Sequence, residues 1–296
     1  MQSVPFLHNL AVAVAFFVFS FAAQAAANRT FVSASGNDSN ASLNCGATTP
    51  CRTFGAALSV TSADGEIVVL TSGGYGPATI TQGVTITAIG VTASVTVTTG
   101  NALEINTTGD VTIDGLGLHG TGSAVNGINV VNVGFLRLDN VAVEGFGESG
   151  VFLQGSGGLA IFDSYLSNNA NCGLLVNSAG GTTAYVKSTV ADHNGYGFAQ
   201  SWARVVIEDS AARYNANAGF WVNGGSLLSL IRDEAVHNSI GIQAVGGTTQ
   251  FAYSNITQNT NYAIVVAGGI IAGSNPGTSV VSGSISGLLG TASMLQ

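Results

Sequence analysis

Apolar and polar residues alternate in a unit that repeats along most of the chain. A glycine followed by an apolar, strand-like segment returns every 22 to 24 residues, as in the stretch ANAGFWV around Gly219. A fixed period of this length indicates a solenoid. The repeats lack a helical period of 3.6 and are rich in turn residues, which predicts coils of short strands. The landmark positions are Gly127, Gly150, Gly173, Gly197, Gly219, Gly241 and Ala263.

Stacking the coils places equivalent residues in columns. One residue after the landmark, the column is apolar in every coil: Ile128, Val151, Leu174, Phe198, Phe220, Ile242 and Ile264. Three residues after it, the column is apolar with one exception: Val130, Leu153, Val176, Gln200, Val222, Ala244 and Val266. A spacing of two between buried columns is that of a strand with one face in the core. Equivalent strands run in the same direction, so we expect parallel sheets.

A polar column lies four residues before the landmark. Its members are Asn169, His193, Asn215, His237 and Asn259. Side chains that carry both donors and acceptors can bond to the turn backbone and to each other. We therefore predict a polar ladder at a turn, in which the two histidines are structural rungs rather than catalytic or metal-binding groups.

Three segments are expected along the chain. Residues 1–27 have the features of a secretory signal peptide, with an apolar run at 10–23 followed by Ala-Gln-Ala. The alternative is an N-terminal membrane anchor, although this run is short for a span. Residues 28–62 form an N-terminal cap with an amphipathic helix over 53–60, because a solenoid must cover its exposed end. Residues 63–296 form the solenoid, without any later membrane span.

The cysteines agree with export to a secreted or periplasmic location. Attachment of the exported protein to the cell surface is an open alternative. Cys45 and Cys51 bracket a short loop and are expected to form a disulfide in an oxidising compartment. Cys172 is expected to be a buried, small apolar side chain. The spacings do not match a zinc site, and we expect no metal and no cofactor.

The amino-acid composition of the chain limits the classes of molecule that we expect it to bind. Charged residues make up 7% of the chain and the net charge is −8, against about 25% charged residues in ordinary domains. Without a basic patch, nucleic acid is not an expected partner.

Two segments near the N-terminus resemble those of a known protein family. FVSASGNDSN at 31–40 and TPCRTFGAAL at 49–58, followed by Asn-rich coils, resemble the opening of bacterial right-handed parallel β-helix proteins of the pectin-lyase-like superfamily. The resemblance implies an all-β, right-handed parallel β-helix solenoid, here with about 22–24 residues per coil, and a short N-terminal capping helix. The superfamily includes lyases, hydrolases, epimerases, tailspikes and adhesins, so it does not fix an activity.

The catalytic signatures of these enzymes are missing. The lyase pattern Arg-x-Pro-x-x-Arg is absent, and so are the polygalacturonase signatures. Tyr196-Gly197-Phe198 matches the first half of an alginate epimerase motif. Ala199-Gln200-Ser201 then replaces the Asp-Pro-His that would carry the chemistry.

One charged column could still carry chemistry. It contains Asp139, Asp163, Lys187 and Asp209, and Arg232 joins it after a slip of one residue. In an enzyme, Lys187 would lie between Asp163 and Asp209 and act as a base, while the carboxylates would bind Ca²⁺ or form an acid pair. The alternative is a surface salt ladder that keeps the coils in register.

The outward column two residues after the landmark is unusually apolar. It contains Asn129, Phe152, Leu175, Ala199, Trp221, Gln243 and Val265, and Trp202 follows nearby. Exposed apolar patches mark contact sites, so Phe152, Trp202 and Trp221 are candidate glycan-binding residues, unless a loop or tail covers them. We expect an exported β-helix that binds polysaccharide or a surface protein. The alternative is a polysaccharide lyase or glycoside hydrolase acting on an acidic glycan.

Overall fold

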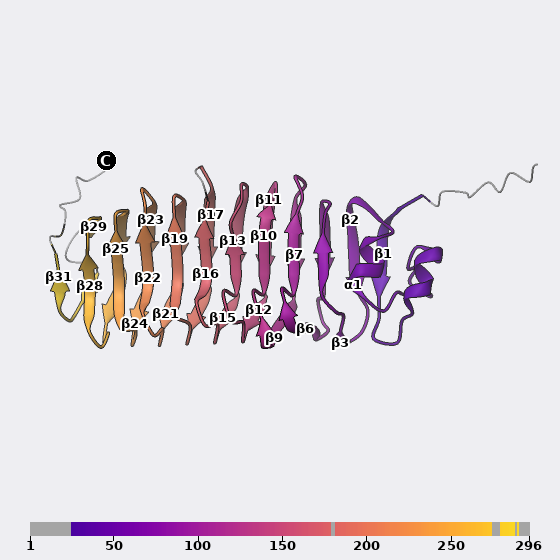
Figure 1. Cartoon of the computed structure of the whole chain (residues 1–296), viewed down its shortest axis with the longest axis horizontal. Helices are drawn as coiled ribbons and strands as arrows, with labels where there is room; N and C mark the ends of the chain where they lie inside the picture. Colours follow the sequence, from indigo (N-terminus) through magenta and orange to yellow (C-terminus); the bar gives the residue numbers. More distant parts are fainter. Residues whose placement is uncertain (1–24, 179–180, 274–278, 288, 290–296) are drawn as a thin grey trace, which may run out of the picture.

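The computed structural model describes residues 25–178, 181–273, 279–287 and 289, and the chain winds into one long parallel solenoid (Figure 1). Each coil contributes one strand to each of three sheets, which we call A, B and C. Most of the segment predicted to be a signal peptide, residues 1–24, lies outside the described residues. Among the helices described, none is long and apolar enough to cross a membrane.

The strands of each sheet pair in parallel with their neighbours in the adjoining coils. Sheet A contains β1 (Ala27–Val32), β2 (Thr61–Val69), β5 (Val84–Thr87), β8 (Val111–Asp114), β11 (Phe135–Asp139), β14 (Gly158–Phe162), β17 (Thr183–Lys187), β20 (Arg204–Glu208), β23 (Leu227–Ile231), β26 (Thr248–Ala252) and β29 (Ile270–Gly273). Sheet B contains β3 (Gly73–Gly74), β6 (Ala93–Gly100), β9 (Leu116–Ala124), β12 (Ala142–Glu144), β15 (Tyr165–Ser167), β18 (Val190–Asp192), β21 (Ala211–Arg213), β24 (Glu234–Val236), β27 (Asn255–Thr257) and β30 (Val280–Val281). Sheet C contains β4 (Ala78–Ile80), β7 (Leu103–Asn106), β10 (Ile128–Asn132), β13 (Val151–Leu153), β16 (Cys172–Asn177), β19 (Tyr196–Ser201), β22 (Ala218–Asn223), β25 (Ile240–Val245), β28 (Tyr262–Val266) and β31 (Ile285–Ser286).

The predicted apolar columns form the core of sheet C. All residues of the column that begins at Ile128 are buried, and the strand register aligns them one above the other. The second column is buried from Val130 to Ala244, and Val266 is half-buried near the C-terminal end. Gln200 also faces inward, and neither side-chain amide atom has a hydrogen-bond partner within the described residues.

The polar ladder is confirmed, but the prediction that histidines are rungs is wrong. The rungs are asparagines throughout: Asn169, Asn194, Asn215, Asn238 and Asn259. In two coils the turn between the rung and the landmark glycine is one residue shorter, so counting back four positions reaches the histidine next to the rung. His193 and His237 are instead exposed, and their rings stack on Tyr214 with centroids 5.1 and 4.8 Å apart.

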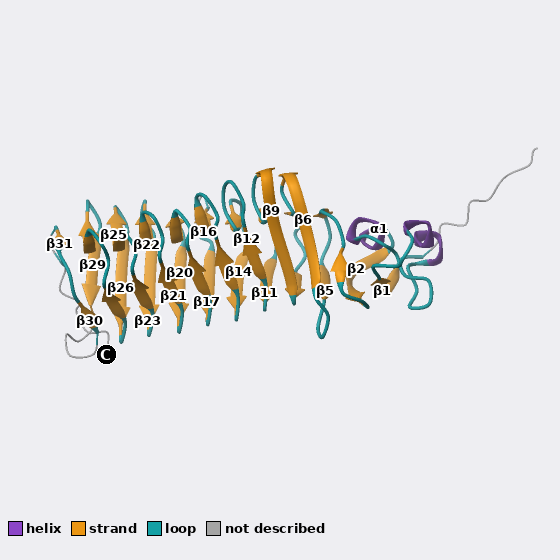
Figure 2. Ribbon diagram, turned by 90° about the horizontal axis from the view of Figure 1, so that it is seen from below, coloured by secondary structure: helices purple, strands orange, loops and turns teal. Residues whose placement is uncertain are grey.

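The N-terminal end of the solenoid is covered by a short helix, as the sequence predicts. α1 (Phe54–Leu58) begins after Thr53, whose side chain accepts a hydrogen bond from the backbone N–H of Ala56. Phe54 is buried against Tyr75, with ring centroids 5.3 Å apart. Figure 2 shows this helix beside β1 and β2 at the end of the stack. The turn at 38–43 is a 3-10 helix, η1 (Asp38–Leu43), and the structure contains the Cys45–Cys51 disulfide next to it.

Candidate groove on sheet C

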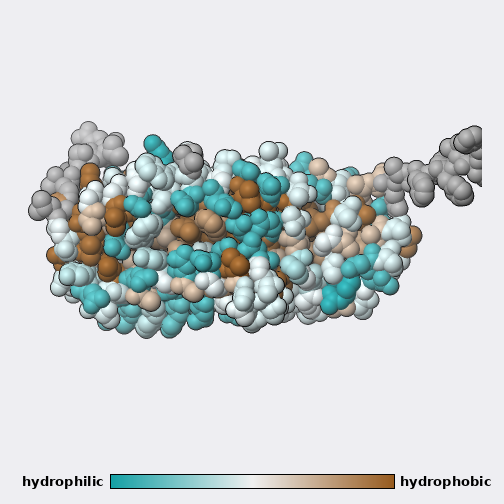
Figure 3. Space-filling model, viewed as in Figure 1, coloured by the Kyte–Doolittle hydropathy of each residue, from teal (hydrophilic) through white to brown (hydrophobic). Residues whose placement is uncertain are grey.

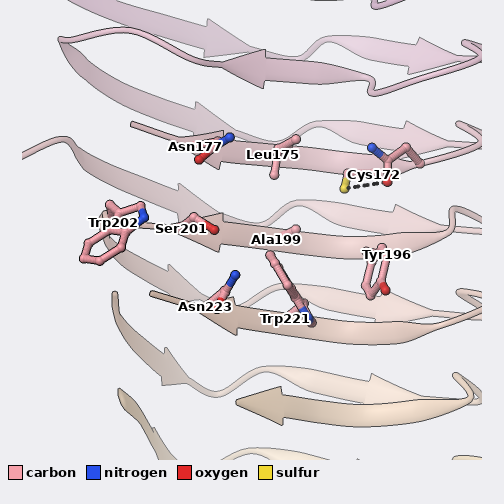
Figure 4. Close-up of a pocket in the computed structure, with 10 residues that line it drawn as sticks. Cys172, Leu175, Asn177, Tyr196, Ala199, Ser201, Trp202, Trp221 and Asn223 are labelled. Carbon is pink, nitrogen blue, oxygen red and sulfur yellow. Dashed lines mark hydrogen bonds between the residues drawn. The ribbon is translucent and has the colours of Figure 1, made fainter. Parts of the chain in front are cut away.

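A groove with a volume of about 530 Å³ lies on the outer face of sheet C. It crosses β16, β19 and β22, three neighbouring strands of adjoining coils (Figure 4). Its lining residues are Asn171, Cys172, Leu175, Asn177, Tyr196, Ala199, Ser201, Trp202, Trp221 and Asn223. Figure 3 shows apolar side chains gathered between hydrophilic ones on the face that carries these strands.

The floor of the groove comes from the outward apolar column. The register pairs Leu175 with Ala199 and Ala199 with Trp221, so these three side chains lie one above the other. The small side chain of Ala199 leaves room between its two large neighbours. The ring of Tyr196 lies beside Trp221, with centroids 5.8 Å apart and the planes tilted by 51°. The result is an apolar floor with an aromatic corner.

Trp202 stands at the end of the groove in the turn after β19. Its backbone has a φ of 59°, and the residue is 60% exposed. The indole lies against Gly224 and Gly225. The contact is so close that a Cβ added at Gly224 would come within 2.8 Å of the Cε2 atom of Trp202. Both glycines have positive φ values, which glycine adopts at little cost. The turn of the next coil therefore supports the exposed ring.

The three predicted glycan-binding residues are only partly brought together. Trp202 and Trp221 line the same groove. Phe152 does not line it, but it pairs with Leu175 and is half-buried at the edge of the floor. It continues the apolar strip into β13.

Sequence reasoning missed the polar side of the groove. Asn177, Ser201 and Asn223 form one outward column, two residues beyond the floor column on the same strands. The alternation of strand side chains would have found them. Cys172 is buried as predicted, and burial raises the pKa of its thiol to about 12, so it is not a nucleophile at neutral pH.

The charged column lies elsewhere, on sheet A and the turn that follows it. In the strand register, Lys187 lies between Phe162 and Glu208 rather than between two aspartates. Asp163 and Asp209 belong to the next column, in the turn, where each has a positive φ. In the described part of the chain, Asp163 forms no ion pair with Lys187. Of the predicted Asp163–Lys187–Asp209 arrangement, the Lys187–Asp209 pair is therefore formed and the Asp163–Lys187 pair is not, because Lys187 ends its strand one residue before the column of the two aspartates.

The charged residues of this region bind each other. Arg232 approaches Asp209 with two nitrogens, at 2.6 and 3.1 Å, and also contacts Glu208. Lys187 Nζ lies 3.6 Å from Asp209 Oδ2 and 3.8 Å from Glu208 Oε2. Hydrogen bonds from Tyr185 and Arg232 lower the pKa of Glu208, and the hydrogen bond from Arg232 lowers the pKa of Asp209. Both carboxylates stay ionised at neutral pH, so neither supplies the protonated carboxyl that a glycosidase needs.

A second depression, with a volume of about 420 Å³, borders this cluster. It is lined by Ser188, Val190, Asp209, Ser210, Ala211, Arg213, Arg232 and Glu234. Across residues 25–178, 181–273, 279–287 and 289, no three side chains of the types His, Cys, Asp and Glu converge as metal ligands do.

The comparisons with known proteins agree with this architecture. The family model described as "Right handed beta helix region" matches residues 69–261. The chain belongs to this family. The curated protein sequences contain no match to it.

Two solved structures share the right-handed β-helix. One is pectate lyase Pel9A, with a TM-score of 0.55, 15% identity, and coverage of 87% of this chain and 80% of that one. The other is a GH136 lacto-N-biosidase from Eubacterium ramulus, with a TM-score of 0.60 and 11% identity. The match covers 82% of this chain and 60% of the lacto-N-biosidase chain. At these identities the likeness concerns the fold, and the predicted right-handed parallel β-helix is confirmed.

Proposed function

We propose that this protein is an exported β-helix that binds polysaccharide or a glycan-bearing surface partner through the groove on sheet C. The observation that carries the proposal is that the two tryptophans of the chain, Trp202 and Trp221, both line one open groove. Flat aromatic rings beside amide and hydroxyl groups suit a ligand with one apolar face and many hydroxyls. The apolar run at 10–23 and the Cys45–Cys51 disulfide support a secreted or periplasmic location.

The alternative is a polysaccharide lyase or glycoside hydrolase that acts on an acidic glycan. It is supported by the depression beside Asp209 and Arg232 and by the fold shared with a pectate lyase. In that reading Lys187 acts as the base, and Ca²⁺ bound by carboxylates offsets the substrate charge. The mutual pairing of Lys187, Asp209 and Arg232 opposes it, because each cation is already held by a carboxylate.

The experiment combines binding and turnover on the purified protein. We expect a glycan array to show binding, and assays of reducing ends and unsaturated products to show no turnover. Trp221→Ala should weaken binding at least about tenfold, or about 1.4 kcal/mol, since it removes the largest part of the floor. Tyr253→Ala is the matched control, because Tyr253 is an aromatic residue that is 62% exposed and lies outside the groove.

The same assays can overturn the proposal. Product formation that disappears in Lys187→Ala would establish the enzyme. Binding that survives in Trp221→Ala would move the site away from sheet C.

A further inference from the structure

The groove on sheet C is uncharged. None of the ten described residues that line it is an acid, a lysine, an arginine or a histidine. In a chain with a net charge of −8, a groove without any cation gives an anionic ligand no compensating charge. Transfer of an unpaired carboxylate out of water is costly.

The surroundings of the groove strengthen this argument. The charged side chain that contacts the lining is acidic: Asn171 Nδ2 donates to Glu148 Oε2 at 3.4 Å. The basic residues of these coils lie on other sheets. Lys187 and Arg204 are in strands of sheet A, and Arg213 is in sheet B. A uronate in the groove would therefore meet one neighbouring acid, Glu148, and no basic residue in the lining.

The polar groups of the groove fit hydroxyl and amide partners. Asn177, Ser201 and Asn223 form a column along one side of the floor. Amide side chains donate and accept, and a hydroxyl does both, so this column can follow a ligand whose hydroxyls also do both. The backbone N–H of Gly224 donates to Asn223 Oδ1 at 2.8 Å, which leaves the side-chain amide of Asn223 to act as a donor.

The size of the groove indicates an oligosaccharide. It extends along β19 and into the turn that follows, from Tyr196 to Trp202. At about 3.3 Å per strand residue, this is on the order of 20 Å. Tyr196 lies at one end and Trp202 in the turn at the other, and Trp221 pairs with Ala199 between them, so the rings of Trp221 and Trp202 offer separate stacking surfaces.

We infer that the groove binds an uncharged oligosaccharide of hexoses or N-acetylhexosamines and discriminates against uronates. The inference rests on the proposed function and names the ligand class of that same site. Two sugar rings stack on Trp221 and Trp202, and the column of Asn177, Ser201 and Asn223 binds their hydroxyl or acetamido groups.

The test uses the intrinsic tryptophan fluorescence of the protein, since both of its tryptophans line the groove. The probes are cellotriose, triacetylchitotriose and trigalacturonate. We expect at least one neutral trisaccharide to change the emission with a Kd at least tenfold lower than that of trigalacturonate. Asn177→Lys places a cation in the groove on an exposed residue, and we expect it to improve trigalacturonate binding at least fivefold at low salt.

The other outcomes separate the inference from the proposed function. If trigalacturonate changes the emission with an equal or lower Kd than both neutral sugars, the inference is wrong while glycan binding in the groove stands. If no trisaccharide changes the emission, and the glycan array is also blank, both are wrong.

Discussion

Replacing Asn215 by alanine should lower the free energy of unfolding by on the order of 3–5 kcal/mol. Asn215 is 1% exposed. Its Oδ1 accepts from the backbone and side chain of Asn194, at 3.0 and 3.3 Å, and its Nδ2 donates to Ala191 O at 3.1 Å and Asn238 Oδ1 at 2.9 Å. Alanine leaves several of these buried groups without a partner, at about 1–3 kcal/mol each. Denaturant unfolding followed by circular dichroism measures the change.

The control is Asn217→Ala, two residues away in the same turn, because Asn217 is exposed. It should change the free energy of unfolding by less than about 0.5 kcal/mol. Coils of a solenoid contact only their neighbours, so hydrogen exchange in Asn215→Ala should increase mainly in the coils that hold Asn194 and Asn238. Equal stabilities of the two variants would show that the ladder is not a main source of stability.

Replacing Asp233 by serine should stabilise the protein above pH 7 by on the order of 2–4 kcal/mol. Asp233 occupies a rung in a second ladder, between Ser210 and Ser254. Burial raises its pKa from the usual 3.8 to about 7, although the backbone N–H groups of Ser210 and Ile231 donate to it. The difference between these two pKa values corresponds to about 4 kcal/mol of folding free energy once the carboxyl is ionised in both states. Serine can donate to the carbonyl two residues before it, as Ser210 and Ser254 do.

The sign of the pH dependence follows from the raised pKa. Well below the usual pKa of 3.8, Asp233 is protonated in both the folded and the unfolded chain, and its contribution to stability is fully present. As the pH rises from 4 to 7, the unfolded chain ionises first, so the folded state loses stability. Thermal or denaturant unfolding of both proteins between pH 4 and 8 should therefore show a gap that widens with pH.

Asp163→Ser is the control for this comparison. Asp163 is exposed in the same kind of turn, and Ser188 occupies the equivalent position of the next coil with a similar positive φ. A gap between Asp233→Ser and the unmodified protein that stays constant from pH 4 to 8 would contradict the raised pKa.

The core and the sheets could be predicted from the sequence because the landmark glycine keeps a nearly constant period. Columns counted forward from it, such as those that begin at Ile128 and Val130, run along a single strand and keep their register. Columns counted backward cross a turn, and turn lengths differ between coils. This is why His193 and His237 were predicted to be rungs, whereas Asn194 and Asn238 are the rungs.

Turns of different length also limited the prediction of the two candidate sites. The outward position of Trp221 was predicted correctly, because it lies two residues after a landmark on a strand. Lys187 and Asp209 were assigned to one column, although a strand end and the following turn separate them by one position. No periodicity could predict that the turn at Gly224 supports Trp202, since this contact joins two turns of different coils.

The most direct measurement is a crystal structure of the protein with a bound neutral trisaccharide. The account predicts sugar rings stacked on Trp221 and Trp202, with hydroxyl or acetamido groups within hydrogen-bond distance of Asn177 or Asn223. A trisaccharide bound instead in the depression beside Asp209 and Arg232, with the groove on sheet C empty, would contradict it.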